Sequence, residues 1–168
     1  MTLTSLLPTL RESIPSPFRS GLWPVGAVAS THDVTITGVS LLRFVELCAT
    51  PCVTTGPAVI PLSGGIPSST EWTSAVVVSV VAATDDGVRT LTIDASLAAV
   101  PHDGGELRMI GRISHAPDRV WVVRDANGDR VALDAPTLPA DLRPGDLLAL
   151  PCRGAVALGD IRPGSSGR

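Results

Sequence analysis

Three side chains in this sequence could carry acid–base, nucleophilic or anion-binding chemistry. His115 lies in the stretch RISHAPDR between Arg112 and Arg119. An imidazole there could exchange a proton while a guanidinium holds a carboxylate, although an exposed turn is the commoner place for such a histidine. Cys152 follows a proline after an apolar run, where a thiolate could act as a nucleophile, but nothing nearby in the sequence would lower its pKa. We take His115, Cys152 and Arg112 as candidate catalytic residues.

The remaining cysteines and histidines do not form a motif for a metal or a cofactor. Cys48 and Cys52 have C-x3-C spacing, but Pro51 lies between them and no second pair has the spacing of metal ligands. We expect these thiols to be buried on the apolar face of a helix. The pairs His32-Asp33 and His102-Asp103 are expected in solvated turns beside strands. The sequence therefore predicts no metal site and no bound cofactor.

Two acidic residues and three tryptophans are better explained by structure than by catalysis. Asp94 and Asp146 are expected to accept hydrogen bonds at a turn and at a strand end. Trp72 and Trp121 are expected to anchor the core or an interface, and Trp23 is expected to cap the N-terminal arm.

Composition and charge exclude several classes of function. All 13 basic residues are arginines, the net charge is −3, and only five residues are Trp or Phe. Without a basic run or stacking residues, nucleic acid is not expected as a partner. The N-terminus lacks the cationic start of a signal peptide, and the longest apolar run, residues 75–83, is too short to cross a membrane. With three cysteines, this indicates a reduced, cytoplasmic protein.

The first part of the chain predicts helices and strands in alternation. An apolar period of i, i+3, i+4, i+7 predicts a short helical arm within residues 1–24, whose stripe must be buried on its own core or on a partner; its members are Leu3, Leu6, Leu7 and Leu10. Residues 33–39 alternate as in a strand. Ser40 can cap a helix over residues 41–49, which Pro51 stops. A strand over 52–61 and a loop over 62–70 follow.

The second part predicts a series of β-hairpins. Asp86-Gly87 and Asn127-Gly128 are favoured tight turns between alternating runs. Residues 107–114 read as a strand, Pro144-Gly145 turns into a last strand, and AVALGDI could add another. Strands about ten residues apart favour a mainly β fold, a small β-barrel with one or two short N-terminal helices. We expect a single β-barrel domain over 25–162 and a flexible tail over 163–168.

Three segments in the right order resemble one enzyme family. VTITGVSLLRFVELCATPCVT (34–54), VVVSVVAATDDGVRTLTIDASL (76–97) and LPADLRPGDLLALPCRGAV (138–156) are similar to parts of the group IV, pyridoxal-phosphate-dependent decarboxylases, especially diaminopimelate decarboxylase. In that family the first strand and the last third of the chain build one β domain, and a β/α barrel is inserted between them. Here only residues 54–73 separate the two halves.

The resemblance implies a decarboxylase-like β domain whose cofactor barrel is missing, with the loop over 62–70 closing the gap. It also implies that residues 34–39 and 147–150 share one sheet. The family holds pyridoxal phosphate on a lysine as a Schiff base, and this chain contains no lysine. Val156 stands where the family has an aromatic residue. The resemblance thus implies a β domain without decarboxylase activity.

Three functions remain open. The first is an interaction or accessory protein in amino-acid or specialised metabolism, forming a homodimer or a complex with a homologous or biosynthetic enzyme. The second is a cofactor-independent enzyme or binding protein for a small molecule, with residues 54–73 and 99–120 covering an apolar pocket beside His115. The third is a structural subunit of a larger assembly.

Overall fold

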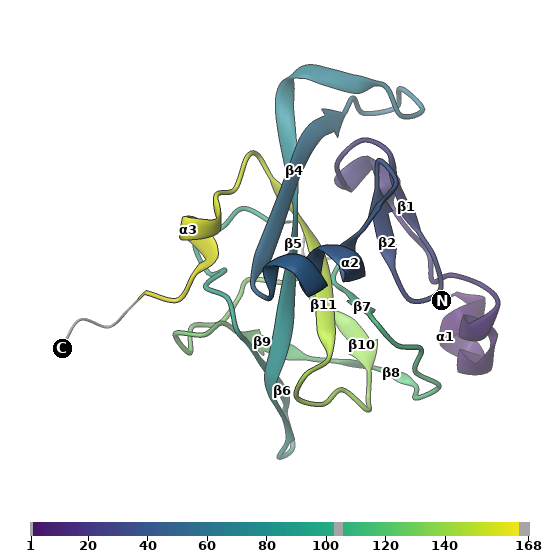
Figure 1. Cartoon of the computed structure of the whole chain (residues 1–168). Helices are drawn as coiled ribbons and strands as arrows, with labels where there is room; N and C mark the ends of the chain where they lie inside the picture. Colours follow the sequence, from purple (N-terminus) through teal and green to yellow (C-terminus); the bar gives the residue numbers. More distant parts are fainter. Residues whose placement is uncertain (1, 103–105, 165–168) are drawn as a thin grey trace.

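The computed structural model describes residues 2–102 and 106–164, and it confirms a mainly β fold (Figure 1). The helical elements are few and short. They are the α-helices α1 (Leu3–Leu6), α2 (Leu41–Cys48) and α3 (Leu158–Ile161) and the 3-10 helices η1 (Pro8–Glu12) and η2 (Ser20–Leu22).

The longest strand, β5, organises the largest sheet. It spans Pro67–Asp85 and pairs antiparallel with β4 (Cys52–Val59), β11 (Leu147–Arg153) and β6 (Arg89–Ile93) along its length. The sheet continues from β11 to β7 (Arg108–Ile110) and from β6 to β9 (Val122–Arg124), the last pair being parallel. Smaller sheets join β1 (Ala27–Ala29), β2 (Val34–Ile36) and β3 (Val39–Ser40), and β8 (Asp118–Val120) and β10 (Thr137–Pro139).

The middle of β5 is buried on both faces, which explains its continuous apolar run. Val76, Val78 and Val80 contribute to one core cluster, in which Leu91 and Trp121 are also buried. Because successive side chains of a strand point to opposite faces, its alternate residues contribute to a second cluster. That cluster lies under α2 and the β1–β3 sheet, and its members include Ala75, Val77, Val34, Leu41 and Trp23. The expectation that Trp23 caps the arm is therefore wrong, because its side chain is buried in the core of the protein.

Local sequence signals predicted several elements correctly. The Ser40 side chain accepts a hydrogen bond from the Arg43 amide at 3.1 Å and caps α2. β5 and β6 form the expected hairpin, where Gly87 adopts a φ of +85° that favours glycine. The expected strand over 52–61 is β4, and the turn at Pro144-Gly145 leads into β11.

The expectation that residues 34–39 and 147–150 share a sheet is wrong. β2 pairs with β1 and β3 in the three-stranded sheet, whereas both edges of β11 are taken by β5 and β7. No edge of β11 is left for β2 over the paired residues. The two strands meet instead through side chains, since Val34 and Ala149 share the second core cluster.

The expected closed barrel is not confirmed. The large sheet runs in the open order β7-β11-β5-β6-β9, and within the described residues no pairing joins β7 to β9. β9 pairs with β6, and the N-terminal segment lies beside β7, where Arg108 donates to the Ser16 carbonyl oxygen.

Other expectations fail where a tertiary contact decides the local structure. The loop expected over 62–70 is shorter, because β5 begins at Pro67 and extends a hairpin with β4. The run before Asn127-Gly128 splits at the buried Trp121 into β8 and β9, which join different sheets. The strand suggested by AVALGDI is absent, since that stretch ends in helix α3. Of the expected tail, residues 165–168 lie outside the described residues.

The N-terminal arm is helical but interrupted. Pro8 has no amide hydrogen to continue α1, and it starts the 3-10 helix η1 instead. The arm lies beside β7 and β8 because Arg11 reaches across to the loop between them. This contact fixes the position of the loop that carries Arg112 and Ser114.

Candidate functional site

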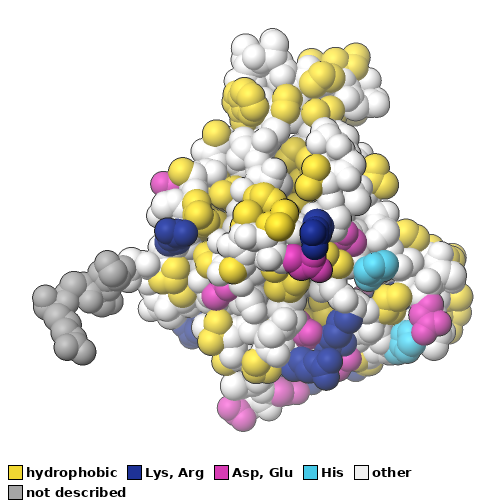
Figure 2. All heavy atoms as spheres, in the orientation of Figure 1, with side chains coloured by type: hydrophobic (Ala, Val, Ile, Leu, Met, Phe, Trp, Pro, Cys, Tyr) yellow, Lys and Arg dark blue, Asp and Glu magenta, His cyan; other side chains and the backbone are white. Residues whose placement is uncertain are grey.

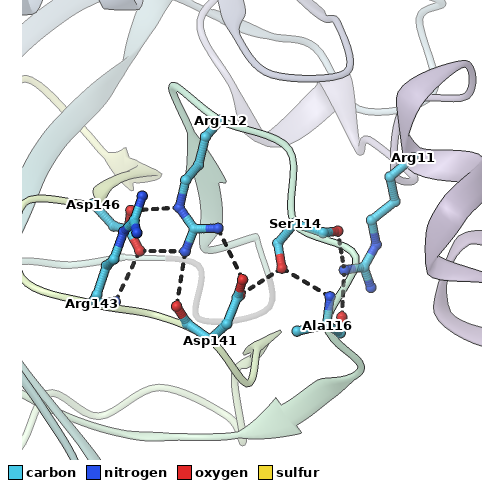
Figure 3. Close-up of polar contacts among 7 residues, drawn as sticks. All are labelled: Arg11, Arg112, Ser114, Ala116, Asp141, Arg143 and Asp146. Atoms are coloured by element: carbon cyan, nitrogen blue, oxygen red, sulfur yellow. Dashed lines mark hydrogen bonds and ion pairs between the residues drawn. The ribbon is translucent and has the colours of Figure 1, made fainter.

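Arg112, the candidate just after β7, is held by two aspartates (Figure 3). Its Nε and NH2 donate to the two carboxylate oxygens of Asp146, each at 2.7 Å. Its NH1 donates to Asp141 Oδ2 at 3.1 Å, and NH2 also donates to the Asp141 carbonyl oxygen at 2.9 Å. Such bidentate geometry makes strong, directional ion pairs. Arg112 therefore fastens the PADLRPGD stretch to the end of β7.

The same interactions shift the pKa values of Arg112 and Asp141. The hydrogen bonds with Asp146 raise the pKa of Arg112, with a further contribution from Asp141. Partial burial opposes the shift at Asp141, but the hydrogen bond from Ser114 and the ion pair with Arg112 lower the pKa of that carboxyl. Asp146 also accepts a hydrogen bond from the Arg143 amide at 2.9 Å, as expected for a turn acceptor. Arg112 and Asp141 thus keep their charges at neutral pH and are unsuited to proton transfer.

Ser114 links this cluster to the N-terminal arm. Its hydroxyl donates to Asp141 Oδ1 at 2.5 Å and accepts from the Ala116 amide at 3.1 Å. Arg11 NH1 donates to the carbonyl oxygens of Ser114 and Ala116 (Figure 3). Its NH2 forms a 2.7 Å ion pair with Asp118. One polar chain therefore runs from the Asp146 turn to the arm.

His115 is placed away from Arg112's partners. Its Nε2 lies 3.1 Å from Oε1 of Glu12 on the arm, and its side chain is about half exposed. It is not among the residues that line the cavity described below. The structure thus does not bring His115 and Arg112 together as an acid–base site, although both lie in the loop between β7 and β8.

The three cysteines differ in burial. Cys152 is buried in the first core cluster, and desolvation raises the pKa of its thiol to about 12. Cys52 is buried in the second cluster on β4, where burial raises its pKa to about 11. Cys48 is exposed at the end of α2, contrary to the expectation of a buried helix face. A thiol with a raised pKa stays protonated at neutral pH, so the buried pair lacks the thiolate that nucleophilic chemistry needs.

The other singled-out residues mostly support turns or the core. The Asp94 carboxylate accepts from the Ser79 amide at 2.8 Å, and Trp121 is buried, both as expected. His32 is exposed and Asp33 accepts from the Val34 amide, while Asp103 lies outside the described residues. Trp72 is exposed on β5, so its expected role at an interface remains a prediction.

A cavity of about 480 Å³ lies between the N-terminal segment and β7. Thr4 and Arg11 of the arm contribute to one wall, and Arg108, Arg112 and Leu138 contribute to the other. Lining hydroxyls come mainly from the N-terminal segment and the β1–β2 turn, and the apolar part comes from β7, β10 and their neighbours. The cavity thus combines guanidinium, hydroxyl and apolar surface.

Arg108 is a largely buried cation of this wall, and its nearest carboxylate, that of Glu106, is not within hydrogen-bonding distance. Its NH2 donates to the Ser16 carbonyl oxygen at 3.0 Å, and its guanidinium carbon lies 5.1 Å from the centre of the Phe18 ring. The Glu106 carboxylate is 4.0 Å from NH1 and is already bonded to Arg19. Desolvation lowers the pKa of Arg108, an effect that Glu106 opposes.

Sequence reasoning missed Arg11, Glu106 and Arg108. Each is an isolated charge in a loop, arm or short strand, with no neighbouring motif. A useful signal was nevertheless present in RMIGR, which places two arginines four residues apart beside an apolar strand.

The described residues contain neither a group of metal-ligating side chains nor a membrane-spanning helix. Among residues 2–102 and 106–164, no three His, Cys, Asp or Glu side chains are grouped so that they could hold a metal ion. In the same part of the chain, the helices are all too short or too polar to span a bilayer.

Comparison with known proteins finds structural likeness to decarboxylases. No protein-family model matches the chain, and no curated protein sequence matches it. Two crystal structures of diaminopimelate decarboxylase from Helicobacter pylori, both complexed with L-lysine, are similar to 52% and 46% of this chain, at 19% and 20% identity and TM-scores of 0.37 and 0.34. The arginine decarboxylase of Paramecium bursaria Chlorella virus is similar to 54% of it, at 16% identity and a TM-score of 0.39.

The similar regions cover about half of this chain. The matched regions are 24%, 20% and 28% of those enzymes' own lengths, so the chain spans about a quarter of them.

Proposed function

We propose that this chain is an interaction protein with a decarboxylase-like sequence, which acts without pyridoxal phosphate and associates through its N-terminal arm. Its partner is a second copy of the chain or a homologous or biosynthetic enzyme of amino-acid or specialised metabolism. The observation that carries the proposal is the exposure of the arm's leucines.

The arm presents an apolar face that the rest of the described chain does not cover. Leu3, Leu6 and Leu7 are 65%, 57% and 54% exposed, although their spacing is that of a buried helix face. Arg11 meanwhile holds the arm against the body. A fixed apolar face in water is typical of a contact surface for another protein.

The β4–β5 hairpin offers a second uncharged surface. Figure 2 shows only hydrophobic and uncharged side chains at the end of this hairpin, and residues 47–70 contain no charged residue. Ile60, Leu62 and Ile66 are exposed there. Pro57 and Pro67 remove amide donors from its strands, so a partner would pack on side chains and not extend the ladder.

The lack of lysine supports the part of the proposal that concerns the cofactor. Without an amine to form the Schiff base, this chain cannot hold pyridoxal phosphate in the way the family does. Addition of the cofactor to the purified chain should give no absorbance of a protein-bound Schiff base, and the appearance of that band would contradict this part.

The decisive test is the replacement of Leu3, Leu6 and Leu7 by Ser. Covering the exposed part of each leucine contributes about 1 kcal/mol, so the triple variant should weaken association roughly a hundredfold. Sedimentation velocity over a range of concentrations measures this change, first for self-association and then in mixtures with a candidate enzyme.

The control replaces Val81, Val88 and Val120 by Ser, because these side chains are similarly exposed elsewhere. It should leave association unchanged. A monomer at every concentration would overturn the homodimer, and an arm variant that associates as well as the wild type would overturn the role of the arm.

A second candidate function, small-molecule binding, is favoured by the cavity beside β7. Its volume of about 480 Å³ lies within the range of ligand sites, roughly 300–1,000 Å³.

A further inference from the structure

The arginines of the cavity wall differ in how closely they are paired with carboxylates. Four arginines and three acidic residues line the cavity, and two further aspartates, Asp141 and Asp146, pair with Arg112. Three of the arginines have a carboxylate within hydrogen-bonding distance, at 2.7 Å for Arg11, 3.0 Å for Arg19 and 2.7 Å for Arg112. Only Arg108 among them has no carboxylate closer than 4.0 Å. One positive charge of the wall therefore lacks a close counter-ion.

The hydrogen-bond donors of the wall show the same deficit. Within the described residues, two buried side-chain nitrogens have no hydrogen-bond partner, Arg11 Nε and Arg108 NH1. Both arginines line this cavity. Since buried polar groups in proteins are almost always paired, these two donors show that the wall is incompletely paired, although both atoms lie beneath the surface that a ligand could touch.

The position of Arg108 is already fixed for such an acceptor. The Phe18 ring under its guanidinium and the hydrogen bond to the Ser16 carbonyl oxygen hold the side chain on the N-terminal segment. A guanidinium held in this way loses little conformational entropy when it binds a planar anion.

We propose that the cavity binds a small organic molecule with a single carboxylate and an apolar body, with Arg108 as the counter-ion of that carboxylate. The hydroxyl of Thr4 can solvate the polar end, and Leu107, Met109 and Leu138 can pack on the apolar body. A single negative charge matches the one guanidinium of the wall that has no carboxylate closer than 4.0 Å, whereas a dianion would meet the nearby acids Asp33, Glu106 and Asp118. This inference names the ligand class of the second candidate function and is independent of association through the arm.

Calorimetric titration of the full chain tests the proposal with three probes. They are phenylpropionate, its neutral analogue phenylpropanamide, which has nearly the same shape, and inorganic phosphate. We expect phenylpropionate to bind at least tenfold more tightly than the amide, and phosphate to bind more weakly than phenylpropionate. Because this comparison uses the wild-type protein, it does not depend on the folding of any variant.

Two variants then locate the site. Arg108→Met should reduce affinity for phenylpropionate tenfold or more and leave that for the amide unchanged. Arg89→Gln, which removes an arginine paired with Asp85 on the β5–β6 hairpin, should bind like the wild type.

Each other result overturns the proposal in a distinct way. Equal binding of acid and amide would support a small-molecule site but remove the carboxylate from it. Tighter binding of phosphate would replace the organic acid by an inorganic anion, and full binding by Arg108→Met would move the site elsewhere. No binding of any probe would reject this cavity as the ligand site while leaving the association of the arm untouched.

Discussion

Two arginines of the same short segment, Arg108 on β7 and Arg112 just after it, have opposite environments. Arg112 makes four hydrogen bonds to two aspartates, and its strongest pair is with the buried Asp146. Arg108 makes one hydrogen bond, to a backbone carbonyl, and one of its nitrogens is buried without a partner. An arginine whose donors are paired with carboxylates supports the fold, as Arg112 does, whereas Arg108 lines the cavity without a close carboxylate.

The largest expected effect is that of Arg112→Met. Its removal leaves Asp146, whose side chain is 6% exposed, as a buried carboxylate without its counter-ion. The free energy of unfolding should fall by about 3 kcal/mol, as measured by urea denaturation. Arg112→Lys should lose less, since it keeps the charge but not the bidentate geometry. A loss below about 1 kcal/mol for the Met variant would break the comparison.

A smaller loss is expected from Ser114→Ala, which tests whether the cluster extends to the arm. The buried hydroxyl bonds both Asp141 and the Ala116 amide, so its removal should lower the free energy of unfolding by about 1–2 kcal/mol. Ser63→Ala, which loses only an exposed hydrogen bond from the Ile66 amide in the hairpin, serves as the control and should change it by a few tenths. Equal losses in the free energy of unfolding for the two substitutions would show that Ser114 does not contribute to the stability of the Arg112 cluster.

Arg108→Met should change the free energy of unfolding by less than about 1 kcal/mol in either direction. Replacing a poorly paired buried charge by an apolar side chain of similar length is often neutral or stabilising. The measurement is the same urea denaturation, without ligand. A loss as large as that of Arg112→Met would show that both arginines are structural.

The smallest effect is a pH dependence carried by Asp141. Its pKa is lowered in the folded chain, so its contribution to stability is complete above the ordinary value of 3.8 and is lost as the pH falls from there through the lower folded pKa. The carboxylate is about half exposed, which keeps the contribution small. Urea denaturation of Asp141→Asn and of the wild type should therefore differ more at pH 6 than at pH 3, and a pH-independent difference would contradict this.

The elements that the sequence predicted are those set by neighbours in the chain. Ser40 caps α2 through an amide three residues away, and Asp86-Gly87 closes the β5–β6 hairpin by its own backbone preference. The continuous apolar run of β5 likewise marks a strand buried on both faces. The pairing of strands far apart in sequence was not predictable in this way. β2 and β11 resemble strands of one domain in the sequence, but two partners already occupy the edges of β11.

The candidate site shows the same division. Arg112 was found from its position beside His115, but the structure pairs it with aspartates 29 and 34 residues away and pairs His115 with Glu12 of the arm. Arg11 carries no local signal, and the signal of Arg108 is limited to its spacing from Arg112 in RMIGR. Their significance depends on which donors remain unpaired after the arm has packed on β7.

The sequence by itself determined the mainly β character, the tight turns and the absence of a lysine, because these depend on residue type and short spacing. The tertiary structure decided which strands share a sheet, which arginine is neutralised and which leucines remain in water. The physical reason is that edge occupancy, charge pairing and burial are properties of residues brought together from distant parts of the chain.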